Sequence, residues 1–221
     1  MPRTIDVVLF DFGGVFTASP FGAVGDAAVE FGAEPGQMES IMFGSYHEDS
    51  DHAWHRLERG EISLATAQQE IMAEGSRQGL EFDPLRVLFS LGEKGGARSQ
   101  LVECVRGLRR DGYRTALLTN NVAEFREHWR AMLPVEELFE LVVDSSEVGL
   151  RKPDPAIYRL TLERLGGVAA ERTVFLDDYH PNVDAAVALG IHGILVEDDP
   201  SPALTTLHRL LRGRVDRAAG R

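Results

Sequence analysis

The side chains best suited to chemistry in this chain fall in four short segments: residues 10–15, 118–121, 149–155 and 175–178. Asp11 in the first segment is a carboxylate that can attack phosphorus and form a covalent intermediate. Asp11 and Asp178 offer the oxygen ligands that Mg²⁺ prefers. Thr119, Asn120 and Lys152 can donate hydrogen bonds to phosphoryl oxygens. These residue types together indicate a phosphoryl-transfer site.

The glycine-rich turn after Asp11 can supply further donors, because successive backbone N–H groups in such a turn favour anions. Asn121 adds a second amide beside Asn120. We therefore predict a phosphate site, next to a bound Mg²⁺, that is formed by Phe12, Gly13, Gly14, Thr119, Asn120, Asn121 and Lys152.

These segments must be positioned by strands, and five short apolar runs fit that role: residues 5–12, 113–120, 138–145, 173–178 and 193–196. Their apolar cores are continuous, which is typical of strands buried on both faces. Helical patterns lie between them, for example after Ser99, Pro155, Pro181 and Ser201. This alternation predicts an α/β fold with a Rossmann-like, doubly wound parallel sheet, which binds ligands at the carboxyl ends of its strands.

Residues 19–96 break the alternation and indicate several helices without a strand. Helices are expected over residues 22–31 and 63–78, and Trp54 and Leu57 are spaced as one face. Glycines bracket the region, with Gly95-Gly96 as a hinge. We predict a core domain of residues 1–18 and 97–221 and a small inserted helical cap domain of residues 19–96.

Composition limits the possible partners. The 221 residues carry a formal net charge of −12, which argues against nucleic acid and membrane surfaces because both attract basic faces. The single cysteine, Cys104, allows no disulfide within the chain and favours a reducing compartment. No signal peptide or transmembrane run is evident. We expect a cytoplasmic monomer or homodimer that acts on a small phosphorylated metabolite.

The four segments resemble, in order and spacing, the four motifs of the haloacid dehalogenase (HAD) superfamily, with residues 19–96 in the position of a C1 cap. Asp11 matches the first motif, Thr119 the second, Lys152 the third, and Asp177-Asp178 the fourth. The chain is similar to the phosphatases that resemble the N-terminal domain of soluble epoxide hydrolase, which commonly read D-F-G-G-V at the first motif. The resemblance implies a Mg²⁺-dependent hydrolase with Asp11 as nucleophile and with Asp11, the Gly13 carbonyl and Asp178 as metal ligands.

Two positions depart from the family pattern. HAD phosphatases usually carry a second Asp where this chain has Gly13, and that Asp protonates the leaving oxygen and then activates water. General acid catalysis contributes about 10²–10⁴-fold, so we expect activity to fall as the leaving-group pKa rises. Asn182 stands where many relatives have Asp, and it could orient Lys152 or a metal-bound water.

Several alternatives stay open. A haloacid dehalogenase would also use an aspartate nucleophile without the second Asp, and a catalytically impaired phosphate-binding protein would explain Gly13 by lost turnover. One residue of the pair Asp177-Asp178 could cap the following helix. His180 could replace the missing acid, and His47, His52 and His55 could form either a zinc site or a charged surface. Phe43, Tyr46 and Trp54 could line a substrate pocket or form the core of the cap, and Tyr179 could contact the substrate.

Overall fold

The centre of the protein is a parallel sheet of five strands, described here in a computed structural model that covers residues 4–34, 36–45, 47–89 and 98–213. The strand order is β3-β2-β1-β4-β5. Their bounds are β1 Val7–Phe10, β2 Arg114–Thr119, β3 Leu141–Asp144, β4 Thr173–Asp177 and β5 His192–Leu195. The predicted fold class and all five predicted strands are confirmed. Four of the predicted strands extend beyond the observed ones by up to three residues at one or both ends, and the fifth is shifted by one residue.

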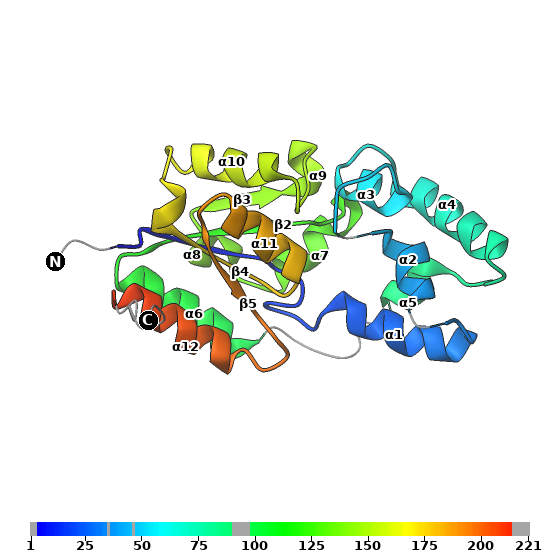
Figure 1. The fold of residues 1–221 in the computed structure, drawn as a ribbon, viewed down its shortest axis with the longest axis horizontal. Helices are drawn as coiled ribbons and strands as arrows, with labels where there is room; N and C mark the ends of the chain where they lie inside the picture. Colours follow the sequence, from blue (N-terminus) through cyan, green and yellow to red (C-terminus); the bar gives the residue numbers. More distant parts are fainter. Residues whose placement is uncertain (1–3, 35, 46, 90–97, 214–221) are drawn as a thin grey trace, which may run out of the picture.

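The sheet is buried because helices cover both of its faces (Figure 1). Successive side chains of a strand point to opposite faces, and those of β1 do so here. Val8 and Phe10 join an apolar cluster with residues of α6 (Ser99–Arg110) and α12 (Ser201–Leu211). Val7 and Leu9 join another with residues of α10 (Pro155–Arg164) and α11 (His180–Ala188). β1 is apolar along its whole length because each of its faces packs against helices.

The strand order places the reversal of winding between β1 and β4. The chain first runs outward from β1 through β2 to β3, and it then crosses back to β4 and β5. In open α/β sheets the crevice beyond the carboxyl ends of the strands at such a switch point is where ligands bind. Phe10 of β1 is in register with Leu176 of β4. Asp11 and Asp177, the residues that follow them, are therefore neighbours at this crevice.

A group of five helices stands at one end of the sheet (Figure 1). They are α1 (Pro20–Phe31), α2 (Gln37–Phe43), α3 (Ala53–Glu58), α4 (Leu64–Arg77) and α5 (Pro84–Phe89). The described part of residues 19–96 holds no strand, as predicted. The helices share an apolar cluster, here called the cap cluster, which includes Met38, Ile41, Met42, Phe43, Trp54, Leu57, Ile71 and, from beyond β2, Val122. The division into a cap and a core domain stays a prediction, and the expected hinge at Gly95-Gly96 lies outside the described residues.

Helix starts follow the predicted capping in part. Asp154 caps α10, with its Oδ1 accepting a hydrogen bond from the N–H of Ala156 at 2.8 Å. Ser99 was expected to cap α6, and this was wrong: the helix begins at Ser99, and Arg98 occupies the capping position without a side-chain bond. An arginine has no acceptor with which to cap, so that helix start is not stabilised by a side chain.

The segment between β2 and β3 is more helical than the sequence pattern indicated. It holds a 3₁₀ turn, η1 (Ala123–Phe125), and two short helices, α7 (Arg126–Ala131) and α8 (Val135–Leu138), and α9 (Ser145–Val148) follows β3. Helices of four to six residues are too short to show a clear hydrophobic period. Among the described residues, no helix is long and apolar enough to cross a membrane. The cytoplasmic location and the oligomeric state stay predictions.

Candidate active site

Lys152 lies between two buried carboxylates at the carboxyl edge of the sheet. Its Nζ is 2.8 Å from Oδ1 of Asp11 and 2.6 Å from Oδ2 of Asp177. All three side chains are nearly or fully buried. Burial alone would lower the pKa of Lys152, but the charges of Asp11 and Asp177 together raise it. The lysine is therefore held as an ammonium ion.

Asp177 is held in place by groups on the segment that follows it. Its Oδ1 accepts a hydrogen bond from the N–H of Tyr179 at 2.8 Å, and the amide of Asn182 donates to both carboxylate oxygens at 3.1 and 3.2 Å. The hydroxyl of Tyr158 in turn donates to the carbonyl of Asn182 at 2.8 Å. Because Asp177 already has a partner on each oxygen, its function here is to orient Lys152. Neither aspartate of the pair occupies the capping position of α11, which is Tyr179.

The backbone of Lys152 is clamped by Asn120. The N–H of Lys152 donates to Oδ1 of Asn120 at 2.8 Å, and Nδ2 of Asn120 donates to the carbonyl of Lys152 at 2.9 Å. This reciprocal pair joins the end of β2 to the segment after α9. We had expected the Asn120 side chain to donate to phosphate, whereas both of its polar atoms bind the Lys152 backbone.

The other residues at the end of β2 also have local partners. The Thr119 hydroxyl donates to the carbonyl of Asn120 at 3.3 Å. Oδ1 of Asn121 accepts from the N–H of Val122 at 2.9 Å, while the N–H of Asn121 donates to the hydroxyl of Ser145 at 3.0 Å. These bonds give the strand end a defined conformation.

Asp178 completes a cluster of carboxylates. One oxygen from each of Asp11, Asp177 and Asp178 lies within 4.8 Å of the others. Burial raises the pKa of Asp11 to about 6, against the opposing effect of Lys152. Burial, together with the charges of Asp177 and Asp11, raises the pKa of Asp178 to about 8. Three carboxylates next to one ammonium ion leave an excess of negative charge, so the donor set and its charge fit a divalent cation.

The turn after β1 is shaped by its two glycines. Gly14 has a φ of 69°, and a Cβ there would lie 1.9 Å from Oδ2 of Asp178. Gly14 is therefore required both by its conformation and by the close approach of the carboxylate. Gly13 differs, because a Cβ built on it would meet nothing within 4 Å. The position of the missing acid thus has room for a side chain.

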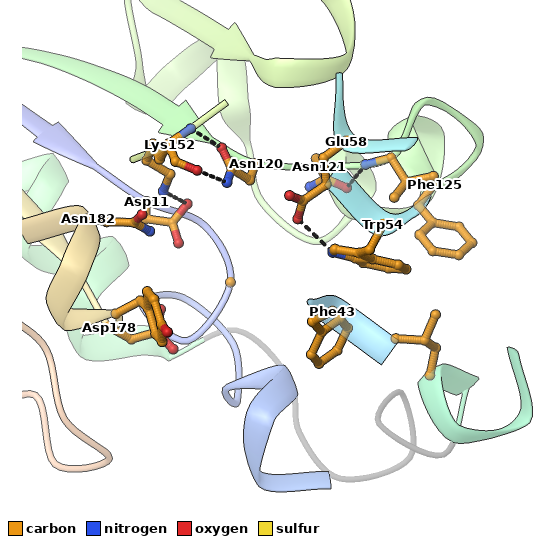
Figure 2. Close-up of a pocket in the computed structure, with 14 residues that line it drawn as sticks. Asp11, Phe43, Trp54, Glu58, Asn120, Asn121, Phe125, Lys152, Asp178 and Asn182 are labelled. Atoms are coloured by element: carbon orange, nitrogen blue, oxygen red, sulfur yellow. Dashed lines mark hydrogen bonds and ion pairs between the residues drawn. The ribbon is translucent and has the colours of Figure 1, made fainter. Parts of the chain in front are cut away.

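These groups open into a cavity of about 240 Å³ beneath the cap helices (Figure 2). The predicted site residues that line it are Asp11, Gly13, Asn120, Asn121, Lys152 and Asp178, and Asn182 and Tyr179 join them. Phe12, Gly14 and Thr119 lie behind the surface and are not among the lining residues. The cap contributes Phe43, Trp54, Glu58 and Leu88, and Val122 and Phe125 complete the wall.

The structure supports neither the acid role considered for His180 nor a metal site formed by His47, His52 and His55. His180 is exposed and pairs with Asp184 at 2.9 Å, and it does not line the cavity. The rings of His52 and His55 meet edge-on with 5.7 Å between their centroids, whereas the ring of His47 lies 6.5 Å from that of Tyr179. Within the described ranges, the three-aspartate cluster is the one group arranged to hold a metal ion. Tyr46 lies outside those ranges.

The sequence did not indicate a role at the site for Glu58 or Arg151, or for Val122 and Phe125, which follow β2 and line the cavity. Phe43 and Trp54 turn out to serve both of the roles considered for them, since they belong to the cap cluster and also line the cavity. One sequence feature is consistent with the contact between Glu58 and Trp54. Glu58 follows Trp54 by four residues, which places both side chains on one face of a helix. Nothing in the sequence pairs Glu58 with Arg151, because 93 residues separate them.

A doubly wound sheet with a strand-end aspartate, a lysine between carboxylates and a group of helices over the site is the arrangement expected from the four motifs. The family of haloacid dehalogenase-like hydrolases matches residues 5–190 of this chain. The chain therefore belongs to the HAD-like hydrolases and is a hydrolase. The resemblance stated from the motifs is confirmed.

Individual relatives agree with this assignment. The chain is 32% identical over 95% of its length to acyl-CoA dehydrogenase family member 10 of Mus musculus, and 31% identical over 50% of its length to bifunctional epoxide hydrolase 2 of Rattus norvegicus. It spans only 19% and 20% of those proteins. A sesquiterpene phosphatase of Aspergillus oryzae is 28% identical over 90% of this chain and 93% of its own length.

A solved structure shows the same fold. The HAD family enzyme from Bacteroides thetaiotaomicron, in complex with magnesium and inorganic phosphate, aligns with a TM-score of 0.61 and 21% identity. The alignment covers 88% of this chain and 96% of that one.

Gly14→Ala should lower the free energy of unfolding more than Gly149→Ala does. Both glycines have nearly the same positive φ, 69° and 68°, so alanine incurs a similar backbone cost of about 1–2 kcal/mol at each. Only Gly14 adds an overlap with Asp178, whereas a Cβ at Gly149 meets nothing within 4 Å. We expect a further loss of about 1–3 kcal/mol at Gly14 from overpacking, measured by urea denaturation. Equal losses would contradict the argument.

Proposed function

We propose that this HAD-like hydrolase is a Mg²⁺-dependent phosphatase of a small phosphorylated metabolite, which acts through an aspartyl phosphate at Asp11. The observation that carries the proposal is the position of Lys152, with its ammonium 2.8 Å from the Asp11 carboxylate at the floor of the cavity. A cation there can orient the nucleophile and bind a phosphoryl oxygen. Such a fixed charge stabilises the transition state of phosphoryl transfer.

Asp11, the carbonyl of Gly13 and Asp178 would hold the Mg²⁺. The ion, when bound, would offset the repulsion between the anionic nucleophile and the anionic substrate. Asp178 suits this role because it lines the cavity, whereas Asp177 is fully buried behind Lys152. The three carboxylates within 4.8 Å of one another support the proposal through their charge.

Each part of the proposed reaction is assigned to particular residues of the chain. A carboxylate oxygen of Asp11 attacks phosphorus, the bond to the leaving oxygen breaks, and water later cleaves the aspartyl phosphate. We assign the binding of phosphoryl oxygens to Lys152, Asn120, Asn121 and the backbone N–H of Gly13, all of which line the cavity. The same role for Phe12, Gly14 and Thr119 stays a prediction from the sequence. For Asn120 the backbone N–H is the donor that we assign, because its side chain holds the Lys152 peptide.

The alternatives are less well supported. A dehalogenase needs no metal site, whereas this chain keeps Asp178 beside Asp11. A protein that binds phosphate without turnover would account for Gly13, but it has no use for a nucleophile oriented by a buried lysine. The phosphatase among the relatives that matches nearly the whole chain also favours a phosphatase.

Asp11→Asn should abolish turnover of phenyl phosphate while leaving the fold intact, because the amide is not a nucleophile. The matched control is Asp144→Asn, which alters another buried strand-end carboxylate, one that bonds to Ser146 and does not line the cavity. Activity is measured by phosphate release and folding by thermal unfolding. If Asp11→Asn hydrolyses the ester at the wild-type rate, Asp11 is not the nucleophile.

Removal of divalent cations with EDTA should abolish phosphate release, and added Mg²⁺ should restore it. The physical reason is that three carboxylates next to one lysine would repel a phosphate dianion unless a cation is bound. The measurement is phosphate release before and after chelation, with halide release from 2-chloropropionate as the comparison. Halide release that persists in EDTA would support the dehalogenase alternative instead.

Gly13→Asp should increase kcat/KM for an alkyl phosphate by up to about 10²–10⁴-fold, the usual contribution of a general acid. The structure has space for the side chain, because nothing lies within 4 Å of a Cβ at this position. The gain should be much smaller for an aryl phosphate, whose leaving group needs no proton. Gly13→Asn is the control with the same shape and no acid. An equal gain from Asn, or equal wild-type rates on alkyl and aryl esters, would refute the role assigned to the missing acid.

A further inference from the structure

The cavity has two chemically different halves (Figure 2). Asp11, Asp178, Lys152 and Asn182 surround one half. The other half, toward the cap, is walled mainly by the apolar side chains of Phe43, Trp54 and Phe125, and Glu58 and Asn121 lie beside them (Figure 2). If the phosphoryl group binds at the charged half, the leaving group faces the apolar half.

Two contacts fix the orientation of the Trp54 ring, one with Phe43 and one with Glu58. The ring packs edge-on against Phe43, with 5.0 Å between the centroids. Its Nε1 donates a hydrogen bond to Oε1 of Glu58 at 2.9 Å. Buried indole N–H groups usually need such a partner. The cap thereby presents a fixed apolar surface to the cavity.

Glu58 also joins the cap to the core. Its Oε2 accepts a charged hydrogen bond from Nε of Arg151 at 2.7 Å. Glu58 is 3% exposed and Arg151 is 0% exposed, so this ion pair is buried. Arg151 directly precedes Lys152 in the chain. Two adjacent residues therefore serve the two halves of the cavity: Lys152 lies at the charged half, and Arg151 contacts the apolar half through Glu58.

The partners of Glu58 decide what it can do. One of its oxygens binds an arginine and the other binds the Trp54 indole. Both oxygens of Glu58 are engaged in these bonds, so we do not assign Glu58 the role of the acid missing at Gly13. A buried ion pair also contributes little net stability compared with an apolar pair, whereas its geometry is strict. Positioning is the role that remains.

We infer that Glu58 is a positioning residue that ties Trp54 of the cap to Arg151 of the core, and that the apolar wall so formed selects phosphate esters with an apolar, uncharged leaving group. This inference rests on the proposed function, because it places the phosphoryl group beside Lys152. A leaving group rich in hydroxyls would lose hydrogen bonds to water against these side chains without gaining new ones. An aryl or long-chain ester would instead bury its apolar surface there.

Binding of phosphonates tests the inference without requiring turnover. Benzylphosphonate and methylphosphonate share a head group that cannot be hydrolysed at carbon, and calorimetry on the full chain with Mg²⁺ gives the ratio of their affinities. We expect the wild-type protein to prefer benzylphosphonate by roughly tenfold or more, a ratio typical of added apolar groups in a hydrophobic pocket. Glu58→Gln keeps an acceptor for Trp54 but loses the ionic bond to Arg151, and the preference should fall to about threefold or less.

A second variant separates positioning from stability. Glu58→Gln leaves the buried Arg151 with only the longer contact to Asp49 at 3.5 Å and can destabilise the fold, whereas Glu58→Gln with Arg151→Met removes both charges of the Glu58–Arg151 pair. We expect this double variant to regain thermal stability but not the preference for benzylphosphonate. Glu70→Gln, which breaks the exposed Arg56–Glu70 pair in the same group of helices, is the control and should keep the wild-type ratio.

Each outcome has one meaning. An unchanged ratio in folded Glu58→Gln, a restored ratio in the double variant, or the absence of any preference in the wild-type protein would overturn the inference. Normal phosphonate selectivity without hydrolysis of phenyl phosphate would instead refute the proposed function and leave the binding inference in place.

Discussion

The ammonium of Lys152, held between the carboxylates of Asp11 and Asp177, is the interaction on which the site depends. It is possible only because β1 and β4 are neighbours in register and both end at the same edge of the sheet. The residues around it serve this contact. Asn120 holds the backbone of the lysine, and Asn182 and the N–H of Tyr179 hold Asp177. A buried charge is tolerated where its partners are themselves fixed by hydrogen bonds.

The same arrangement leaves the site short of positive charge. Burial next to two other carboxylates raises the pKa of Asp178 to about 8, which reflects the cost of ionising it there. A divalent cation would remove that cost, and this is the physical reason to place Mg²⁺ beside Asp178. Gly14 allows the approach of Asp178, whereas Gly13 leaves open space where a general acid would stand. Under the proposed function, the site has groups to hold and attack a phosphate, and Gly13 offers no side chain to protonate the leaving oxygen.

The segment of Arg151 and Lys152 connects chemistry with the cavity wall. The two side chains diverge, one to the carboxylates of the core and the other to Glu58 on α3. Further contacts support the approach of the cap helices to the core. The N–H of Leu64 at the start of α4 donates to Glu124 at 2.7 Å, and a Cβ on Gly60 would lie 2.6 Å from the carbonyl of Ser146. The apolar half of the cavity is therefore formed jointly by two parts of the chain that are distant in sequence.

The strands and the parallel sheet could be predicted from the sequence alone, and so could the charged residues that meet at the carboxyl edge of the sheet. Continuous apolar runs followed by polar residues carry that information locally, because a strand buried on both faces must be apolar along its whole length. Short helices such as α8 escaped prediction because they have too few residues to show a period. The start of α6 was predicted wrongly because Ser99, a typical capping residue, is the first residue of the helix.

The partners of these side chains could be learned only from the three-dimensional structure. The structure shows the Asn120 side chain bonded to the Lys152 backbone, and Glu58 bonded to Arg151 across 93 positions. Such pairings depend on where separate elements meet. That meeting is governed by the packing of whole helices against the sheet, and no single stretch of sequence encodes it.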